Sequence, residues 1–252
     1  MSAQTVIFLG PSMATAEAAE ILPAAEFLPP IRRGDINALM ARETPPTRVG
    51  IVDGCFLHAM SISPKEITKA MNKGVEFYGS SSMGALRATE LHRWGMTGVG
   101  DIFQMFHTGE VDADDEVAIT FDPDTLRALS VPMVNFRVAV RDLTERGLME
   151  AEFGQRLLAV AKALYFPDRT VEAVFRELAL QVGEPVAEKY RQVYVDHAPD
   201  AKRDDAVRLL RLLAEHTGSR PGGGRGGSGT APSGATPDRA APPGALTPGR
   251  AA

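Results

Sequence analysis

The sequence has little of what a disulfide-stabilised, metal-binding or membrane-spanning protein needs. Cys55 is its only cysteine and its five histidines are scattered, so we expect no internal disulfide and no structural metal. It contains no run of about 18 apolar residues that could cross a bilayer. The N-terminus lacks the basic and long apolar regions of a signal peptide, so we expect a cytoplasmic protein with no membrane partner.

The sequence also has no surplus of positive charge. Its formal net charge is −5 and its pI is about 5.6, and it shows no helix-turn-helix or base-stacking motif, so nucleic acid is not an expected partner. No P-loop and no G-x-G-x-x-G motif follows a predicted strand. We therefore expect no cofactor, and interpret Gly98-Val99-Gly100 as a loop between helices.

Apolar residues, by contrast, are abundant enough for a sizeable core. Of the 252 residues, 44% are hydrophobic and 23% are charged, which suits one large domain or two small ones. After Gly218 the composition changes to glycine, proline and alanine with almost no large apolar side chain. We predict a folded domain over residues 1–218, with its core motifs in 5–140, and a disordered tail over 219–252.

Strand and helix signals alternate along the first hundred residues. Strands are predicted at 5–9, near 27, at 48–52 and at 75–78, with helices at 14–22, 35–42, 64–72 and 83–94. A further strand is predicted at 116–121, followed by helices at 136–146, 151–164, 170–181, 186–197 and 200–216. This order predicts an α/β fold, with a parallel sheet of about four strands flanked by helices and a mainly helical C-terminal portion.

Three turns follow strands of the predicted sheet and are candidates for a site. They are Gly10-Pro11-Ser12, Asp53-Gly54 and the serine-rich turn 79–84. Ligands of open parallel sheets bind at the carboxyl ends of the strands, so we expect the three turns to form one site.

The serine-rich turn has the residues of a nucleophile at the start of a helix. Ser82-Met83-Gly84 reproduces the second half of a G-x-S-x-G elbow, with Ser80 in place of the first glycine. The N–H groups and dipole of the following helix could stabilise an oxyanion. Alternatively, Ser81 or Ser82 only caps the helix, which is the more common role of serine at such a position.

A base for this serine is not obvious among the histidines, which leaves Lys65. Ser63 and Glu66 form a capping-box pattern and Pro64 suits the first helical position, so Lys65 falls in the first turn of a helix. The helix dipole disfavours a positive charge there, as a lysine base requires. The alternative is an ordinary surface lysine.

Other polar residues allow two interpretations each. Arg87 and Asp53 could anchor a carbonyl or carboxylate group, or could be each other's ion-pair partner. Cys55 is interpreted as structural. The acidic run 112–116 lacks the spacing of an EF-hand and is interpreted as a solvated loop.

Taken together, these motifs resemble the TfuA-like family over most of the first 140 positions. The matching segments are Gly10-Pro11-Ser12, 30–35, Asp53-Gly54, Lys65-Glu66-Ile67, 82–88, Gly95-Met96, Gly98-Val99-Gly100, 115–117 and 131–137. The resemblance implies an accessory role beside a YcaO-type enzyme, which uses ATP to activate a peptide amide for backbone thioamidation during ribosomal peptide maturation. It also implies hydrolysis of a thiocarboxylated, ubiquitin-like (ThiS-like) sulfur carrier protein, which releases sulfide.

The resemblance also implies roles for individual residues. Ser82 becomes the nucleophile and Lys65 the base, with Ser81 as the rival nucleophile and Ser12 as a relay or third member of a Ser-Ser-Lys arrangement. The expected substrate-binding residues are Asp35, Asp53, Gly54, Gly84, Arg87, Asn135 and Arg137. An alternative is a non-catalytic module that raises the affinity of the YcaO enzyme for its precursor peptide.

Overall fold

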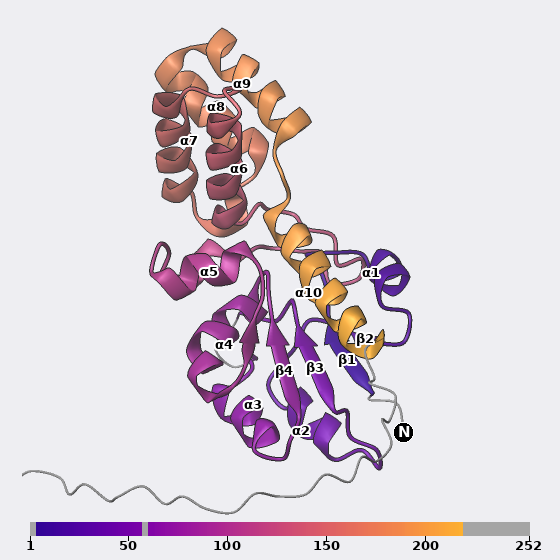
Figure 1. Ribbon diagram of the computed structural model, residues 1–252. Helices are drawn as coiled ribbons and strands as arrows, with labels where there is room; N and C mark the ends of the chain where they lie inside the picture. The colour runs from indigo at the N-terminus through magenta and orange to yellow at the C-terminus, as the bar shows by residue number, and fades with distance from the viewer. Residues whose placement is uncertain (1–3, 57–59, 219–252) are drawn as a thin grey trace, which may run out of the picture. The chain divides into compact units, whose positions relative to one another are not determined.

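A computed structural model describes residues 4–56 and 60–218, and the predicted tail lies outside these residues. Its centre is a five-stranded parallel sheet in the order β2-β1-β3-β4-β5 (Figure 1). The strands are β1 (Thr5–Phe8), β2 (Glu26–Leu28), β3 (Arg48–Ile51), β4 (Glu76–Gly79) and β5 (Thr97–Gly98).

Ten α-helices are described; nine of them confirm the predicted helices, and α5 was not predicted. They are α1 (Thr15–Ile21), α2 (Asp35–Met40), α3 (Pro64–Met71), α4 (Met83–Leu91), α5 (Asp101–Thr108), α6 (Met133–Glu145), α7 (Ala151–Ala163), α8 (Val171–Val182), α9 (Glu184–His197) and α10 (Ala201–Gly218). None of the helices in the described ranges has the length and apolar character needed to cross a membrane.

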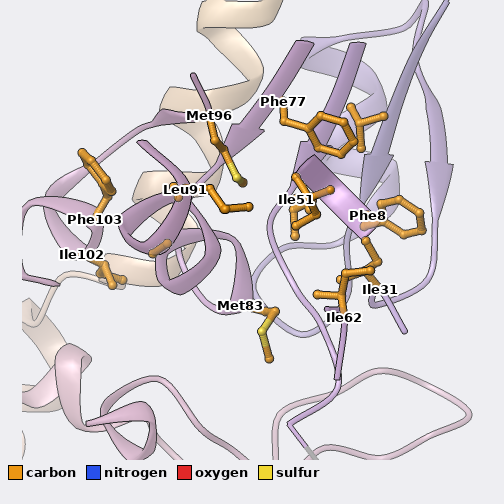
Figure 2. Close-up of a cluster of buried hydrophobic side chains, with 14 of the residues drawn as sticks. Phe8, Ile31, Ile51, Ile62, Phe77, Met83, Leu91, Met96, Ile102 and Phe103 are labelled. Carbon is orange, nitrogen blue, oxygen red and sulfur yellow. The ribbon is translucent and has the colours of Figure 1, made fainter. Parts of the chain in front are cut away.

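The alternation of apolar side chains along the strands supplies two buried faces. Phe8, Ile51 and Phe77 point to one face, where helices α2 to α5 cover them (Figure 2). Ile7 and Val52 point to the other face, where they pack against α1 and α10. The C-terminal helix α10 therefore completes the core of the N-terminal sheet, and Figure 1 shows it lying across the strands.

The strand order creates a switch point at the centre of the sheet. From β1 the chain moves to the edge strand β2, then returns to β3 on the other side of β1. The connections leaving β1 and β3 therefore diverge at the carboxyl ends of these strands, the place where ligands of open parallel sheets bind. Gly10-Pro11-Ser12 and Asp53 lie there.

Helices α6 to α9 have a hydrophobic core of their own. Its larger members include Phe136, Phe153, Phe175 and Tyr194 (the helices are labelled in Figure 1). These helices are the mainly helical C-terminal portion predicted from the sequence.

Two expectations about strands need correction. The predicted strand at 116–121 is wrong, because the 3-10 turn η2 (Asp114–Glu116) precedes an irregular segment there. Val117 and Ala118 produce the apolar signal because they are buried in the core. The fifth strand, β5, was not predicted, because two residues are too few for a periodic pattern.

Candidate functional site

Asp53 joins two of the three turns at the carboxyl edge of the sheet. Its side chain is buried, with 2% of the residue exposed. Oδ2 accepts hydrogen bonds from the N–H groups of Gly10 at 2.9 Å and Ser12 at 3.0 Å, and Oδ1 accepts one from the Ser12 hydroxyl at 2.7 Å. The turns after β1 and β3 therefore lie together, as the sheet topology requires.

A buried lysine that the sequence analysis missed faces this carboxylate. Lys202, on the first turn of α10, is 3% exposed, and its Nζ lies 3.8 Å from Asp53 Oδ1. Nζ also donates to the carbonyl oxygen of Val117 at 3.4 Å. Burial lowers the pKa of Lys202, while the carboxylates of Asp53 and Asp200 act in the opposite direction.

One feature of the sequence could have revealed Lys202. The buried residues Ala206, Leu209 and Leu213 define the inner face of α10, and Lys202 stands four residues before Ala206 on the same face. A lysine at an apolar position of an amphipathic helix is a candidate for burial, but the pattern does not name its partner.

Ser81 connects the serine-rich turn to the same lysine. Its hydroxyl donates to the backbone carbonyl oxygen of Lys202 at 2.7 Å, and it lies 3.4 Å from the Ser80 hydroxyl. Ser81 adopts a φ of 63°, in the left-handed region that non-glycine residues rarely enter. Such strain persists only where surrounding contacts impose it, and it concentrates at functional sites.

Ser82 stands at the N-cap position of α4 without acting as a hydrogen-bonding cap. Within residues 4–56 and 60–218 its hydroxyl has no hydrogen-bond partner. Among the described residues, only Thr5 and Thr144 have a fully buried side-chain oxygen without a hydrogen-bond partner. The unpartnered Ser82 hydroxyl is not in this group, so it keeps some contact with solvent. Of the three serines in this turn, Ser82 has the least constrained hydroxyl.

The N-terminus of α4 offers fewer free N–H groups than the sequence suggested. The Ser82 amide donates to the carbonyl oxygens of Ser80 at 2.8 Å and Val52 at 3.3 Å. The Gly84 amide donates to that of Val52 at 3.3 Å, and the Ala85 amide to that of Ser80 at 3.1 Å. Among the described residues, the Met83 amide has no such acceptor. An oxyanion at this turn would therefore rely first on Met83.

Lys65 is placed on the first turn of α3 with its side chain exposed. Ser63 is the N-cap as predicted, since its hydroxyl accepts from the Lys65 amide at 3.3 Å. Glu66 does not complete the capping box, because its carboxylate instead accepts from the Gly34 amide at 2.9 Å. No hydrogen bond or ion pair of the described residues joins the Lys65 side chain to Ser82.

Arg87 and Asp53 are not each other's partners. The Arg87 guanidinium donates to the carbonyl oxygen of Ile62 at 3.0 Å and to the Ser61 hydroxyl at 3.1 Å, and it pairs with Glu90 at 2.7 Å. Arg87 thus fastens the segment before α3 to α4, and the alternative of an Arg87–Asp53 ion pair is wrong.

Three other predicted binding residues have local structural partners. Gly84 allows α4 to approach β3, because a Cβ there would overlap the carbonyl oxygen of Ile51. Gly54 forms an isolated parallel bridge with Ile31. The Asp35 carboxylate accepts from the N–H group three residues before it at 2.7 Å, at the start of α2. These positions shape the edge of the sheet.

Asn135 and Arg137 are used differently from one another. Asn135 holds the start of α10, because its amide nitrogen donates to Asp200 at 3.0 Å and its oxygen accepts from the Lys202 N–H at 3.3 Å. Arg137 instead forms a two-pronged ion pair with Glu116, at 2.8 and 2.9 Å. Asn135 therefore adjoins the lysine site, whereas Arg137 belongs to a separate ion network.

That network corrects the interpretation of 112–116 as a solvated loop. Glu116 is buried, and its neighbour Asp115 pairs with Lys162 at 2.8 Å and with the buried Arg169 at 3.4 Å. Burial acts to raise the pKa of Glu116, but hydrogen bonds from Arg137 and Lys162 outweigh it and lower the pKa. The acidic run thus anchors this segment to helices of the C-terminal portion. No group of three or more potential metal ligands occurs among the residues described.

Comparison with known proteins agrees with the sequence resemblance. Residues 53–170 match the family model of the TfuA-like proteins, which supports the resemblance. No curated protein matches the chain. The match includes Asp53, Lys65 and the serine-rich turn, whereas Ser12 and Lys202 lie outside it.

Proposed function

We propose that this TfuA-like protein releases sulfide from a thiocarboxylated sulfur carrier for a YcaO-type enzyme. The family is associated with YcaO-dependent thioamidation, which supplies the setting. The carrier, its ubiquitin-like (ThiS-like) nature and the hydrolytic step are our proposal. The observation that carries it is the Ser82 hydroxyl, which lies at the carboxyl edge of a parallel sheet and the start of α4 without a hydrogen-bond partner among the described residues.

The reaction takes two steps at one hydroxyl. In the first, the Ser82 oxygen attacks the thiocarboxylate carbon, the C–S bond breaks, and the serine proton passes to the departing sulfur, giving an ester and hydrosulfide. In the second, water attacks the ester, the serine regains a proton, and the carrier carboxylate leaves with one proton released to solvent. No redox change and no cofactor are needed.

The charge that develops on the carbonyl oxygen needs donors at the turn. The Met83 amide meets this need directly. The Gly84 amide would first have to release the Val52 carbonyl oxygen, and the Ser82 amide those of both Ser80 and Val52. Positive charge at the start of α4 adds to this stabilisation.

A binding module is the second candidate, and burial favours it. Ser80, Ser81 and Ser82 are nearly inaccessible, with exposed fractions of 0%, 0% and 2%. A substrate could reach them only after a local rearrangement. If none occurs, the serine-rich turn is structural and the protein acts by raising the affinity of the YcaO enzyme for its precursor peptide.

Intact-mass analysis of a thiocarboxylated carrier incubated with the protein separates these two functions. We expect wild-type protein to convert thiocarboxylate to carboxylate, and Ser82→Ala to be slower by at least about a thousandfold while remaining folded. Thr108→Ala, which removes an exposed hydroxyl on α5, is the matched control and should convert the carrier normally. An intact thiocarboxylate after incubation with wild-type protein and the YcaO partner would favour the binding module.

A further inference from the structure

Lys202 is a buried amine at the centre of the site that the sequence resemblance does not use. We propose that Lys202, rather than Lys65, is the lysine that moves protons in the reaction, and that it acts through Asp53 and Ser12. This proposal rests on the hydrolytic function proposed above. It makes α10, outside the family match, part of the site.

The surroundings of Lys65 and Lys202 differ, and those of Lys202 are the ones that suit a catalytic base. Lys65 is exposed and has no hydrogen bond or ion pair from its side chain to any described residue. Lys202 is 3% exposed and is enclosed by Asp53 and Val117. Burial lowers the pKa of Lys202 and so favours the neutral amine that a base needs.

Asp53 links Lys202 to a hydroxyl group. Its Oδ1 lies 3.8 Å from Lys202 Nζ and accepts a hydrogen bond from Ser12 Oγ at 2.7 Å. The same carboxylate oxygen therefore faces both groups. In the proposed relay, the hydroxyl proton passes to the carboxylate and then to neutral Lys202, once the amine closes the 3.8 Å separation to hydrogen-bond distance.

Ser12 and Ser82 flank the same short segment after β3. The Ser12 amide donates to Asp53 Oδ2, and the Ser82 amide donates to the carbonyl oxygen of Val52. In the proposed step a water molecule bridges the two hydroxyls. The Ser82 proton enters at Ser12, reaches Lys202 through Asp53, and returns by the same path to the departing sulfur, so Lys202 ends neutral.

Two side chains fix the backbone of Lys202. Ser81 donates to its carbonyl oxygen at 2.7 Å, and Asn135 accepts from its N–H group at 3.3 Å. Ser81 is therefore a positioning residue, because its hydrogen bond joins the serine-rich turn that carries Ser82 to the start of α10. Ser81 makes this contact from the left-handed region, a conformation usually taken by glycine.

The decisive variant is Lys202→Arg. Arginine keeps the positive charge opposite Asp53 but cannot lose its proton, so it preserves an ion pair and abolishes proton transfer. We expect a folded protein whose kcat for thiocarboxylate hydrolysis falls by about 100-fold or more. Lys69→Ala, which removes an exposed lysine of α3, is the matched control.

A second variant guards against misfolding of the arginine protein. Lys202→Ala leaves space for small alkylamines, and we expect added amines to restore turnover at rates that depend on the amine pKa. A role limited to packing would show no such dependence. The kcat of the wild-type protein should also rise with pH as Lys202 loses its proton. This rise should be absent from the pH profile of Lys202→Arg.

The outcomes distinguish this inference from the function on which it rests. No turnover by wild-type protein overturns the hydrolytic function and the role of Lys202 together. Turnover by wild type with near-normal kcat and an unchanged pH profile in Lys202→Arg overturns the role of Lys202 alone. Loss of turnover in Lys65→Ala, with active Lys202 variants, would return the role to Lys65.

Discussion

At a pH below the pKa of Lys202, replacing Asp53 with asparagine should leave the positive charge of Lys202 buried without its counter-charge. The side chains of Asp53 and Lys202 are 3% and 4% exposed, and their charged atoms lie 3.8 Å apart. Breaking a buried ion pair by removing one partner typically costs about 3–5 kcal/mol. Asp53 also accepts three hydrogen bonds from the turn after β1, and asparagine cannot accept all of them. We therefore expect Asp53→Asn to lower the free energy of unfolding by about 4 kcal/mol.

A double-mutant cycle with Lys202→Met isolates the contribution of the pair. Methionine removes the charge while filling much of the same volume, so the double variant no longer holds an unpaired charge. We expect it to be more stable than the sum of the single changes predicts, by about 2 kcal/mol. Urea unfolding followed by circular dichroism measures all four proteins.

The same cycle with Lys69→Met is the matched control, because Lys69 is exposed on α3. That pair should be additive to within about 0.5 kcal/mol. If the effects of Asp53→Asn and Lys202→Met on the free energy of unfolding were also additive to this extent, the claim that the two groups form a coupled buried pair would be refuted.

Two further predictions concern Asp205 and Gly84. Burial raises the pKa of Asp205 to about 6, although the amides of Asp101 and Ile102 oppose this. The contribution of this carboxyl to the free energy of unfolding is fully present below pH 3.8, the pKa of Asp205 in the unfolded chain. It is lost as the pH rises through about 6, a change of about 3 kcal/mol. The unfolding free energy of wild type minus that of Asp205→Asn, measured in urea from pH 4 to 7, should therefore fall as pH rises; an increase would show that the amide bonds dominate. Gly84→Ala should cost about 1–3 kcal/mol and slow carrier conversion, because the added Cβ would push α4 away from β3. A melting temperature equal to that of wild type would contradict this.

Most elements of the sheet could be predicted because their signals are local. The apolar run at the first strand, the Ser63-Pro64 helix start and the glycine-bounded strands all depend on nearby residues. The irregular segment after Glu116 was mistaken for a strand, because a buried irregular segment has the same run of apolar residues as a strand that is hydrogen-bonded in a sheet. An apolar sequence shows that a segment is buried, but it does not show whether its backbone pairs with a neighbouring strand.

Long-range contacts explain what the sequence could not disclose. Lys202 and Asp53 are 149 positions apart, and nothing near either residue identifies the other. Gly98-Val99-Gly100 was interpreted as a loop, yet Gly98 ends β5. Gly100 is the N-cap of α5 with a φ of 97°, and the carboxylate of Asp205 occupies the space that a side chain there would need. Both contacts arise because α10 returns to the sheet.

The most direct test of the central claim is to trap the ester that Ser82 should form. Thiocarboxylated carrier is mixed with the protein, the reaction is stopped with acid during turnover, and the protein is digested and mapped by mass spectrometry. We predict that the carrier's C-terminus is joined to Ser82 as an ester in wild-type protein and is absent from Ser82→Ala. Conversion of the carrier through an ester at Ser12 or Ser81, or with no ester at any serine, would contradict the assignment of Ser82 as the nucleophile.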